Sequence, residues 1–272
     1  MSDMLEDLVS VWDASPLAGS EGAREMLAPT PEVTTNGGAG PAFTRPDLER
    51  EQRKGVPEVV YSPGKTVEQA VEMARLLLVR NGRALLSRVS PELEARLREA
   101  FADYEVQVFS ASRMCVVRRP GSARRTGGGC VGVLTAGTSD IPVAEEAAVL
   151  AAEMGCEVIQ AYDVGVAGLH RLRQPLQELK RRRADVIIVA AGMDGALPSV
   201  VSGLVDVPVI GLPTSVGYGL GGRGVAALLT MLQTCSPGLT VVNIDNGIGA
   251  GATAALIANR VAAARRAAQG GG

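Results

Sequence analysis

The segment Val131-Gly-Val-Leu-Thr-Ala-Gly-Thr-Ser-Asp-Ile-Pro142 decides the fold of this chain. Its first six residues are mostly apolar and run directly into small and hydroxyl-bearing residues followed by a proline. This order is typical of a buried strand, a short loop and the first turn of a helix. Four more apolar runs follow, with helical stretches between them: Glu157–Ala161, Val186–Ala190, Val207–Leu212 and Thr240–Ile244. We therefore predict an α/β domain with a doubly wound parallel sheet, which ends in an Ala-rich helix over Ala252–Ala267.

A different pattern precedes this domain. Thr66 and Gln69 are spaced as a capping box that opens a helix. The elements expected after it are a strand at Ala84–Val89, a helix at Pro91–Phe101, and strands at Glu105–Ser110 and Met114–Arg118. We predict a smaller α+β domain over residues 43–119, joined through a Gly-rich linker at 120–129 to the α/β domain at 130–272. Residues 1–42 are rich in Gly, Pro, Ala, Ser and Thr, which predicts a mobile, disordered N-terminal arm; a short helix over Met4–Trp12 would begin it.

Composition narrows the class of protein. The 272 residues are 46% hydrophobic but only 3% aromatic, so the core must be built from Ala, Val, Leu and Ile. A formal charge of -2 with interspersed signs gives no basic surface for nucleic acid. No apolar run is long enough to span a bilayer, and the acidic start lacks the basic flank of a signal peptide, so we expect a cytoplasmic protein. The four cysteines form no C-x-x-C pair, which argues against a zinc site or a redox dithiol.

Small and polar residues follow the predicted strands where they end. In such sheets the ligand binds outside the carboxyl ends of the strands. The run Thr138-Ser139-Asp140 precedes a helix, whose free amides can hold a phosphate; the alternative is that Ser139 or Asp140 only caps that helix. The later strand ends add Asp194, Ser215, Gly217, Tyr218, Asp245 and Asn246, which also fit ordinary turns. We expect a phosphorylated, nucleotide-like ligand at this edge of the sheet.

Two residue types stand apart from these loops. His170, the only histidine, follows the second strand beside Arg171; a lone histidine is often structural, yet this position equally suits binding of a phosphate or carboxylate. Cys235 ends the helix after the fourth strand and precedes Ser236-Pro237-Gly238, which stops a helix. By position alone, Cys235 is predicted to be a buried or capping cysteine, because a helix C-terminus does not favour a thiolate.

An ordered series of segments resembles the LarB family. These are Gly55-Val-Pro-Glu-Val-Val-Tyr-Ser-Pro-Gly-Lys-Thr66, Gly132-Val-Leu-Thr-Ala-Gly-Thr-Ser-Asp-Ile-Pro-Val-Ala-Glu-Glu146, Asp163-Val-Gly-Val-Ala-Gly-Leu-His-Arg-Leu172, Gly195-Ala-Leu-Pro-Ser-Val-Val201, Pro213-Thr-Ser-Val-Gly-Tyr-Gly219 and Val242-Asn-Ile-Asp-Asn-Gly247. The resemblance covers roughly residues 43–268. LarB proteins are pyridinium-3,5-biscarboxylic acid mononucleotide synthases of nickel-pincer cofactor biosynthesis, and their C-terminal domain is similar to PurE, an aminoimidazole ribonucleotide (AIR) carboxylase.

The resemblance implies a reaction and partners. The substrates would be nicotinic acid adenine dinucleotide and carbon dioxide or bicarbonate, with hydrolysis of the pyrophosphate to release AMP. Cys235 matches the cysteine that adds to the pyridinium ring, and Asp194 stands where the family usually has a glutamate. The resemblance implies a homo-oligomer, with an octamer as the candidate assembly. We expect no tightly bound cofactor; Asp140, Asp194 and Asp245 could either ligate Mg²⁺ at the pyrophosphate step or serve other roles. The alternatives are a PurE-type AIR carboxylase, which would not require Cys235, and a dinucleotide-binding regulator without catalysis.

Overall fold

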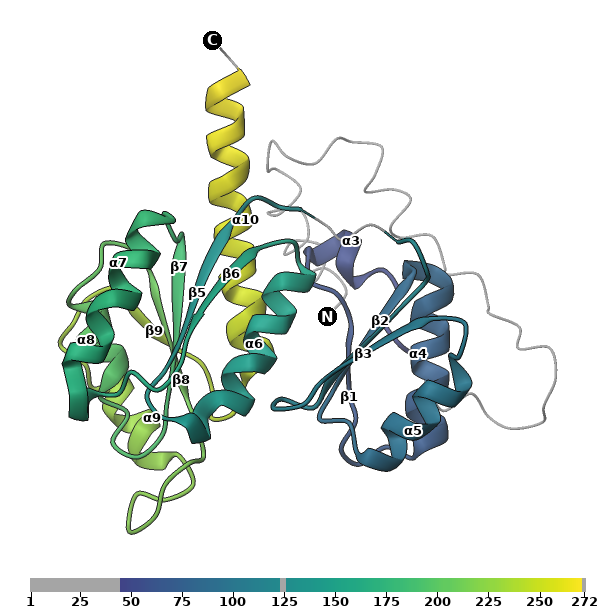
Figure 1. Ribbon diagram of the computed structural model, residues 1–272, viewed down its shortest axis with the longest axis horizontal. Helices are drawn as coiled ribbons and strands as arrows, with labels where there is room; N and C mark the ends of the chain where they lie inside the picture. Colours follow the sequence, from purple (N-terminus) through teal and green to yellow (C-terminus); the bar gives the residue numbers. More distant parts are fainter. Residues whose placement is uncertain (1–44, 123–125, 271–272) are drawn as a thin grey trace, which may run out of the picture. The chain divides into compact units, whose positions relative to one another are not determined.

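The computed structural model describes residues 45–122 and 126–270 (Figure 1). The predicted arm over residues 1–42, with its short helix, lies outside the described residues. Two sheets follow in chain order, and both belong to one unit that runs from Phe43 to Gly272. The predicted fold class is confirmed: a small mixed sheet comes first, and an all-parallel sheet of five strands follows it.

The small sheet has the strand order β1-β2-β4-β3, with β1 parallel to β2 and the other pairs antiparallel. Its elements are α3 (Arg50–Lys54), β1 (Val59–Tyr61), α4 (Val67–Asn81), β2 (Arg83–Ser87), α5 (Pro91–Ala100), β3 (Glu105–Phe109) and β4 (Met114–Arg118). The sequence pattern did not predict β1, because a run of three residues shows no periodicity.

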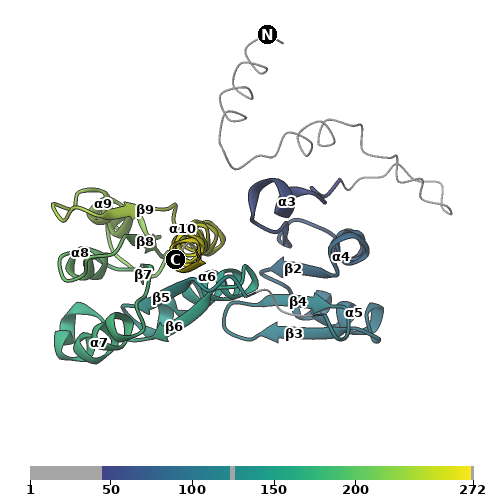
Figure 2. The same cartoon turned by 90° about the horizontal axis from the view of Figure 1, so that it is seen from above.

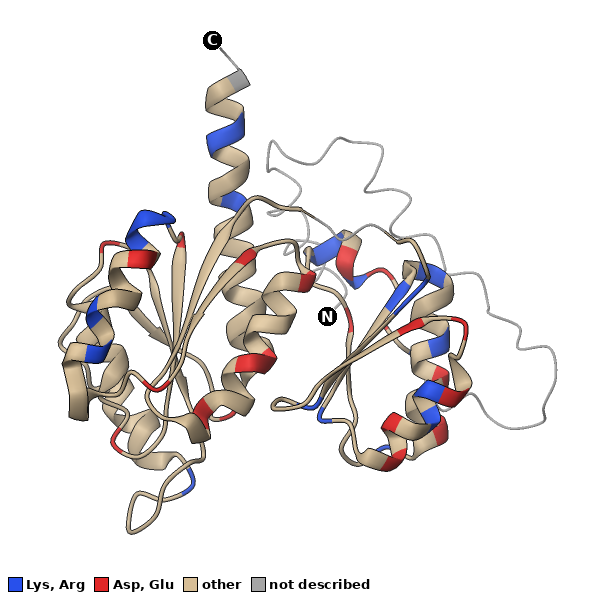
Figure 3. Ribbon diagram, viewed as in Figure 1, with Lys and Arg blue, Asp and Glu red and all other residues tan. Residues whose placement is uncertain are grey.

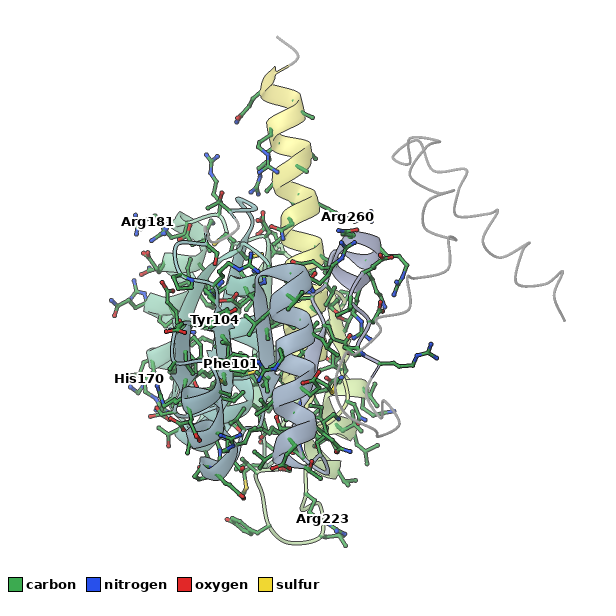
Figure 4. The ribbon with its side chains drawn as sticks, turned by 90° about the vertical axis from the view of Figure 1, so that its right-hand side faces the viewer. Phe101, Tyr104, His170, Arg181, Arg223 and Arg260 are labelled. Atoms are coloured by element: carbon green, nitrogen blue, oxygen red, sulfur yellow. The ribbon has the colours of Figure 1, made fainter. Side chains whose placement is uncertain are left out.

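Helix α4 begins as its sequence predicts. The hydroxyl of Thr66 accepts from the main-chain N–H of Gln69 at 3.2 Å, and the Gln69 side chain accepts from the Thr66 N–H at 3.0 Å. The helix ends at Gly82, which adopts φ 73° in the left-handed region that glycine tolerates. Its apolar face packs with α5 on one face of the small sheet, where Phe101 and Tyr104 meet edge to face at 5.7 Å between ring centroids (Figure 4).

The parallel sheet has the strand order β6-β5-β7-β8-β9. Its elements are β5 (Cys130–Thr135), the short 3₁₀ helix η1 (Thr138–Asp140), α6 (Ile141–Glu153), β6 (Glu157–Ala161), the 3₁₀ segment η2 (Val166–Leu172), α7 (Arg173–Arg181), β7 (Val186–Ala191), α8 (Leu197–Ser202), β8 (Val209–Pro213), α9 (Val225–Leu232), β9 (Leu239–Val241) and α10 (Gly247–Gly270). The predicted strands match closely, except that β9 ends at Val241 instead of Ile244. The chain leaves the sheet there to form a loop.

Helices cover both faces of the parallel sheet (Figure 2). Alternate strand residues pack with α6 and α10 on one face and with α7, α8 and α9 on the other, which is why these strands are apolar on both sides. Among the described residues, no helix is both long and apolar enough to cross a membrane.

Helices α6 and α10 approach each other through glycine. A Cβ added at Gly247 would lie 2.5 Å from the carbonyl oxygen of Val143, and one added at Gly251 would lie 2.5 Å from that of Ala147. Neither distance is sterically possible, so only glycine allows this approach. The contact also explains why α10 starts at Gly247, five residues before the predicted start at Ala252: the glycines are held in the helix by packing.

The small sheet and its helices, residues 50–118, which we call the small sheet unit, are joined to α6 by buried ion pairs. Arg83 on β2 lies 2.6 Å from Glu51 and 3.4 Å from Glu153 of α6, and Arg118 on β4 also pairs with Glu153. Apolar side chains of the small sheet continue this contact into the core beneath α6, as the shared cluster of Leu85, Met114 and Val116 shows. The two sheets are therefore joined by both charge and apolar packing.

Candidate active site

The loops that follow the parallel strands lie together at one edge of the sheet, the lower edge in Figure 1, which we call the rim. The rim comprises residues 136–140, 162–172, 192–196, 214–224 and 242–246. Most of the residues predicted from the sequence lie on it: Thr138, Ser139, Asp140, His170, Arg171, Asp194, Ser215, Gly217, Tyr218, Asp245 and Asn246. Cys235 does not.

Asp140 joins three loops of the rim from the inside. Its side chain is 3% exposed; one carboxylate oxygen accepts from the Gly137 N–H at 2.8 Å and the other from the Thr214 hydroxyl at 2.6 Å. Burial raises the pKa of Asp140, while hydrogen bonds from Thr214 and from the N–H groups of Gly137 and Gly192 oppose that shift. Asp140 therefore closes the short turn η1 through Gly137 and makes no side-chain hydrogen bond that caps α6. The exposed hydroxyls of this turn belong to Thr138 and Ser139.

Asp245 occupies the loop between β9 and α10 with an unusual backbone. Its φ is 55°, a left-handed conformation that non-glycine residues seldom adopt. The Asp245 N–H donates to Pro213 O at 2.9 Å, and a carboxylate oxygen accepts from the Ser215 N–H at 2.8 Å. Asn246 accepts from the Gly249 N–H at 2.8 Å and so caps α10. The loops after β8 and β9 are therefore bonded to each other.

His170 and Arg171 lie on η2, at the side of the rim next to β6. Both are exposed, and Figure 4 shows His170 pointing outward. The Arg171 guanidinium pairs with Asp163 at 2.8 Å, a partner that the sequence pattern did not identify. This pair holds a cation at the rim without burying it.

Asp194 lies in the turn after β7 and is exposed; its carboxylate accepts from the Ala196 N–H at 3.3 Å. The turn packs tightly on the next loop, since a Cβ at Gly192 would lie 2.3 Å from Val216 O and the Met193 N–H donates to that oxygen at 2.8 Å. Beyond Val216 the loop extends outward with Tyr218 82% exposed, as the position of Arg223 in Figure 4 illustrates.

Cys235 differs from its sequence-based interpretation in two ways. It is exposed, neither buried nor capping, because α9 ends at Leu232 and the thiol lies in the segment beyond. It also lies at the amino edge of the sheet. Gly238, three residues on, pairs with the first residue of β8, whereas the rim begins after Pro213. Four residue steps of strand separate the two edges, about 13 Å.

The other three cysteines are buried. Burial raises the pKa of Cys115 and of Cys156 to about 12, and it raises the pKa of Cys130 in the same direction. Because the thiolate is the reactive form, these thiols are inert near neutral pH. Cys235 is the accessible thiol of the chain.

A cavity of about 160 Å³ lies beside the rim, between it and the small sheet. It is lined by Val59, Tyr61, Ser87, Arg88, Glu146, Asp245, Asn246 and Ile248. Sequence reasoning missed Arg88 and Glu146. They stand 58 positions apart, Arg88 directly after β2 and Glu146 on helix α6, so no local pattern could have paired them.

Acidic and basic residues are interspersed along the chain (Figure 3). Within residues 45–122 and 126–270, no three His, Cys, Asp or Glu side chains gather in a way that could hold a metal ion. Asp140, Asp194 and Asp245, considered above as ligands for Mg²⁺, do not form such a group. We therefore derive no step through a metal.

Comparisons with known proteins agree with this architecture. Residues 130–269 match the family model of AIR carboxylase, and residues 39–119 match that of the LarB/PurE-like N-terminal domain. An uncharacterized protein of Methanocaldococcus jannaschii is 46% identical over 215 residues, which cover 78% of this chain and 82% of that protein.

Two shorter relatives match about half of the chain. They are N5-carboxyaminoimidazole ribonucleotide mutases of Methanocaldococcus jannaschii and Pyrococcus abyssi, each 34% identical over 132 residues. The match covers 48% of this chain and 77% of the first, and 47% of this chain and 70% of the second. With an AIR carboxylase domain preceded by a LarB/PurE-like N-terminal domain, the chain belongs to the LarB proteins of the AIR carboxylase family.

Proposed function

We propose that this protein carboxylates the pyridinium ring of nicotinic acid adenine dinucleotide and hydrolyses its pyrophosphate, releasing AMP and pyridinium-3,5-biscarboxylic acid mononucleotide. Family membership supports the class of reaction. The observation that carries the specific reaction is the exposure of Cys235 while the other cysteines are buried. A pyridinium ring needs a nucleophile before it can attack carbon dioxide, and a thiolate is such a group.

The carboxylation needs no reactant other than the dinucleotide, carbon dioxide and the side chains of the protein. The Cys235 thiolate forms a C–S bond at the ring carbon para to nitrogen, and the positive ring becomes a neutral enamine. The free meta carbon then attacks carbon dioxide and forms a C–C bond. A base removes the proton from that carbon, the C–S bond breaks, and the ring regains its aromaticity and its charge. We assign the proton to the exposed carboxylate of Asp194.

The rim loops would hold the nucleotide portion. Thr138 and Ser139 expose hydroxyl groups at the turn that leads into α6, where phosphate oxygens can also meet main-chain amides. His170, Arg171, Ser215, Gly217, Tyr218, Asp245 and Asn246 are the remaining candidates for contact with substrate. Asp140 would act from within, because its carboxylate is already bound by Gly137 and Thr214.

Cys235 and Asp194 cannot meet on one ring within a single chain, since they lie at opposite edges of the sheet. We propose that the protein is a homo-oligomer in which Cys235 of one copy faces the rim of another. Exposed apolar side chains support such an assembly. Val225, Leu229 and Leu232 recur along one face of α9, the helix that leads to Cys235. The family resemblance favours eight copies.

The test is mass spectrometry of the purified protein with nicotinic acid adenine dinucleotide and ¹³C-labelled bicarbonate. We expect AMP, a mononucleotide that carries one labelled carboxylate, and a protein adduct of substrate mass. In Cys235→Ala the dinucleotide should still bind, while adduct and product disappear. Carboxylation by Cys235→Ala at a comparable rate would overturn the covalent mechanism.

A second candidate is the reaction named for the shorter relatives. Their similarity to about half of this chain, together with the AIR carboxylase match over residues 130–269, favours chemistry on an aminoimidazole ribonucleotide. That reaction would not need Cys235, so turnover of N5-carboxyaminoimidazole ribonucleotide by both the wild type and Cys235→Ala would favour it. Binding of the dinucleotide with no AMP release from the wild type would favour a regulator instead.

A further inference from the structure

The side chain of Arg88 connects the small sheet with the rim. It follows β2 directly, and its guanidinium donates to the main-chain carbonyl of Asp245 at 2.7 Å, across 157 positions of the sequence. The same guanidinium lies over the ring of Tyr61, 5.5 Å from its centroid. Tyr61 comes from β1, so two strands of the small sheet contribute to this contact.

The residue that Arg88 holds needs external support. Asp245 and Arg88 both have positive φ, 55° and 54°, although neither is glycine. A side chain in this conformation crowds the backbone, so the conformation persists only where surrounding contacts stabilise it. For Asp245 these contacts are its N–H to Pro213, its carbonyl to Arg88, and its carboxylate to Ser215. Arg88 supplies the one of the three that comes from outside the parallel sheet.

Glu146 keeps the guanidinium in place. This carboxylate of α6 is buried, and the Nε of Arg88 lies 3.9 Å from it. Burial raises the pKa of Glu146, and the positive charge of Arg88 acts in the opposite direction. If Arg88 turned away, it would leave a buried carboxylate without its cation, which is unfavourable. The guanidinium is thus held between Tyr61, Glu146 and the Asp245 carbonyl.

We propose that Arg88 is a positioning residue for the rim. It fixes the Asp245 carbonyl, the Asp245 carboxylate in turn fixes the Ser215 N–H, and this chain of contacts sets the shape of the loop after β8. The small sheet unit would thereby act on the substrate site of the AIR carboxylase domain without touching the substrate. The inference rests on the proposed function only in taking Ser215 and Asp245 as contacts of the dinucleotide.

The chain offers a matched control in Arg113. Like Arg88, it is exposed, has a positive φ of 58°, and donates to a main-chain carbonyl at 2.7 Å. Its acceptor, however, is Val89, which lies in the small sheet unit itself. Removal of the Arg113 side chain therefore costs a comparable local contact but no contact with the rim.

The first experiment needs no substrate. Amide hydrogen exchange, read by mass spectrometry, compares Arg88→Ala and Arg113→Ala with the wild type. We expect peptides that cover residues 214–217 and 243–246 to exchange about tenfold faster in Arg88→Ala only, as loss of a charge-assisted hydrogen bond implies. Unchanged exchange of both peptides would overturn the proposal. If Arg88→Ala does not fold, Arg88→Lys, which keeps a cation beside Glu146, is measured in its place.

The second experiment is kinetic. With nicotinic acid adenine dinucleotide, Arg88→Ala should raise KM by about tenfold and change kcat much less, because a misplaced loop weakens binding before chemistry. Arg113→Ala should change neither, and Arg88→Lys should recover part of the loss. An unchanged KM with altered kcat would contradict a positioning role. If the wild type shows no turnover while exchange rises only in Arg88→Ala, the proposed function fails and the positioning role stands.

Discussion

Cys235 and Asp194 lie at opposite edges of one parallel sheet, although both are assigned to one reaction. The segment of Cys235 precedes β9, whereas Asp194 follows β7. In a parallel sheet these positions are separated by the full length of a strand. The proposed chemistry therefore requires two copies of the chain.

Mixed oligomers test this requirement. We expect Cys235→Ala and Asp194→Ala each to be inactive when pure. When the two variants are co-expressed with different tags and doubly tagged oligomers are isolated, about a quarter of the wild-type activity should return, since random pairing of copies gives that fraction of intact sites. If hybrids with both tags stay inactive, both residues act within the same chain and the arrangement is different.

Thiol labelling tests the accessibility of Cys235. With iodoacetamide at pH 8 we expect one label per chain, located on Cys235 by peptide mapping and absent in Cys235→Ser. Cys115 and Cys156, with a pKa of about 12, present roughly one thiolate in ten thousand at that pH. In urea all four cysteines should react, which is the control. Rapid native labelling of Cys115 or Cys156 would contradict their burial.

Asp140 and Thr214 should be coupled in stability. Asp140→Ala leaves the Gly137 N–H and the Thr214 hydroxyl without their buried acceptor, at an expected cost of about 1–3 kcal/mol in the free energy of unfolding. Thr214→Val should cost less once Asp140 is already absent, which a double-mutant cycle in urea measures. Ser139→Ala, at an exposed position, should leave stability within about 0.5 kcal/mol and raise KM. Additive effects of Asp140→Ala and Thr214→Val would contradict the coupling.

Glu146 should make stability depend on pH. Its folded pKa is raised by burial above the ordinary value of 4.5. The stability that this group contributes is thus fully present below about pH 4.5 and is lost as pH rises through the folded pKa. We expect the wild type to lose stability relative to Glu146→Gln over this window, by up to about 1.4 kcal/mol per pH unit.

The measurement is urea unfolding of both proteins from pH 4 to pH 8, followed by circular dichroism. Glu92→Gln, on the exposed surface of α5, is the control. A difference between wild type and Glu146→Gln that does not change with pH would show that burial does not shift this group. In an Arg88→Ala background the loss should extend to higher pH, because the opposing cation is gone.

The sequence predicts the parallel sheet well because β5 and β7 are continuous apolar runs bounded by turn residues, a pattern that few other structures produce. The rim follows from the same pattern, since carboxyl ends of parallel strands share one edge. What the sequence does not reveal is which side chain of Thr138-Ser139-Asp140 turns inward. Three adjacent polar residues look alike in sequence, and only packing against the loop of Thr214 selects Asp140.

Contacts between distant segments were beyond the sequence for a related reason. Arg88 follows a strand at a position where any polar residue could end it, so its residue type indicates no partner. The group it contacts is a main-chain carbonyl, and because every residue has one, the sequence cannot single out Asp245. The sequence Ser236-Pro237-Gly238 is typical of a helix end and therefore predicts that Cys235 is the last, buried or capping residue of the helix; this prediction is wrong. The helix ends earlier, at Leu232, and nothing in this turn sequence indicates that the chain before it is exposed.

The close contact of glycines in α10 with α6 limits the size of the side chains that substitutions can introduce there. Where Gly251 meets the Ala147 carbonyl there is no room for one additional carbon, and the seam around it is formed mainly by alanine. In a saturation-mutagenesis library these positions would tolerate hardly any replacement, while the exposed end of the same helix beyond Ala262 would accept most. Sequence divergence within α10 is thereby confined to its exposed end. A mutant library designed to change substrate specificity should therefore vary the rim loops and leave this helix contact unchanged.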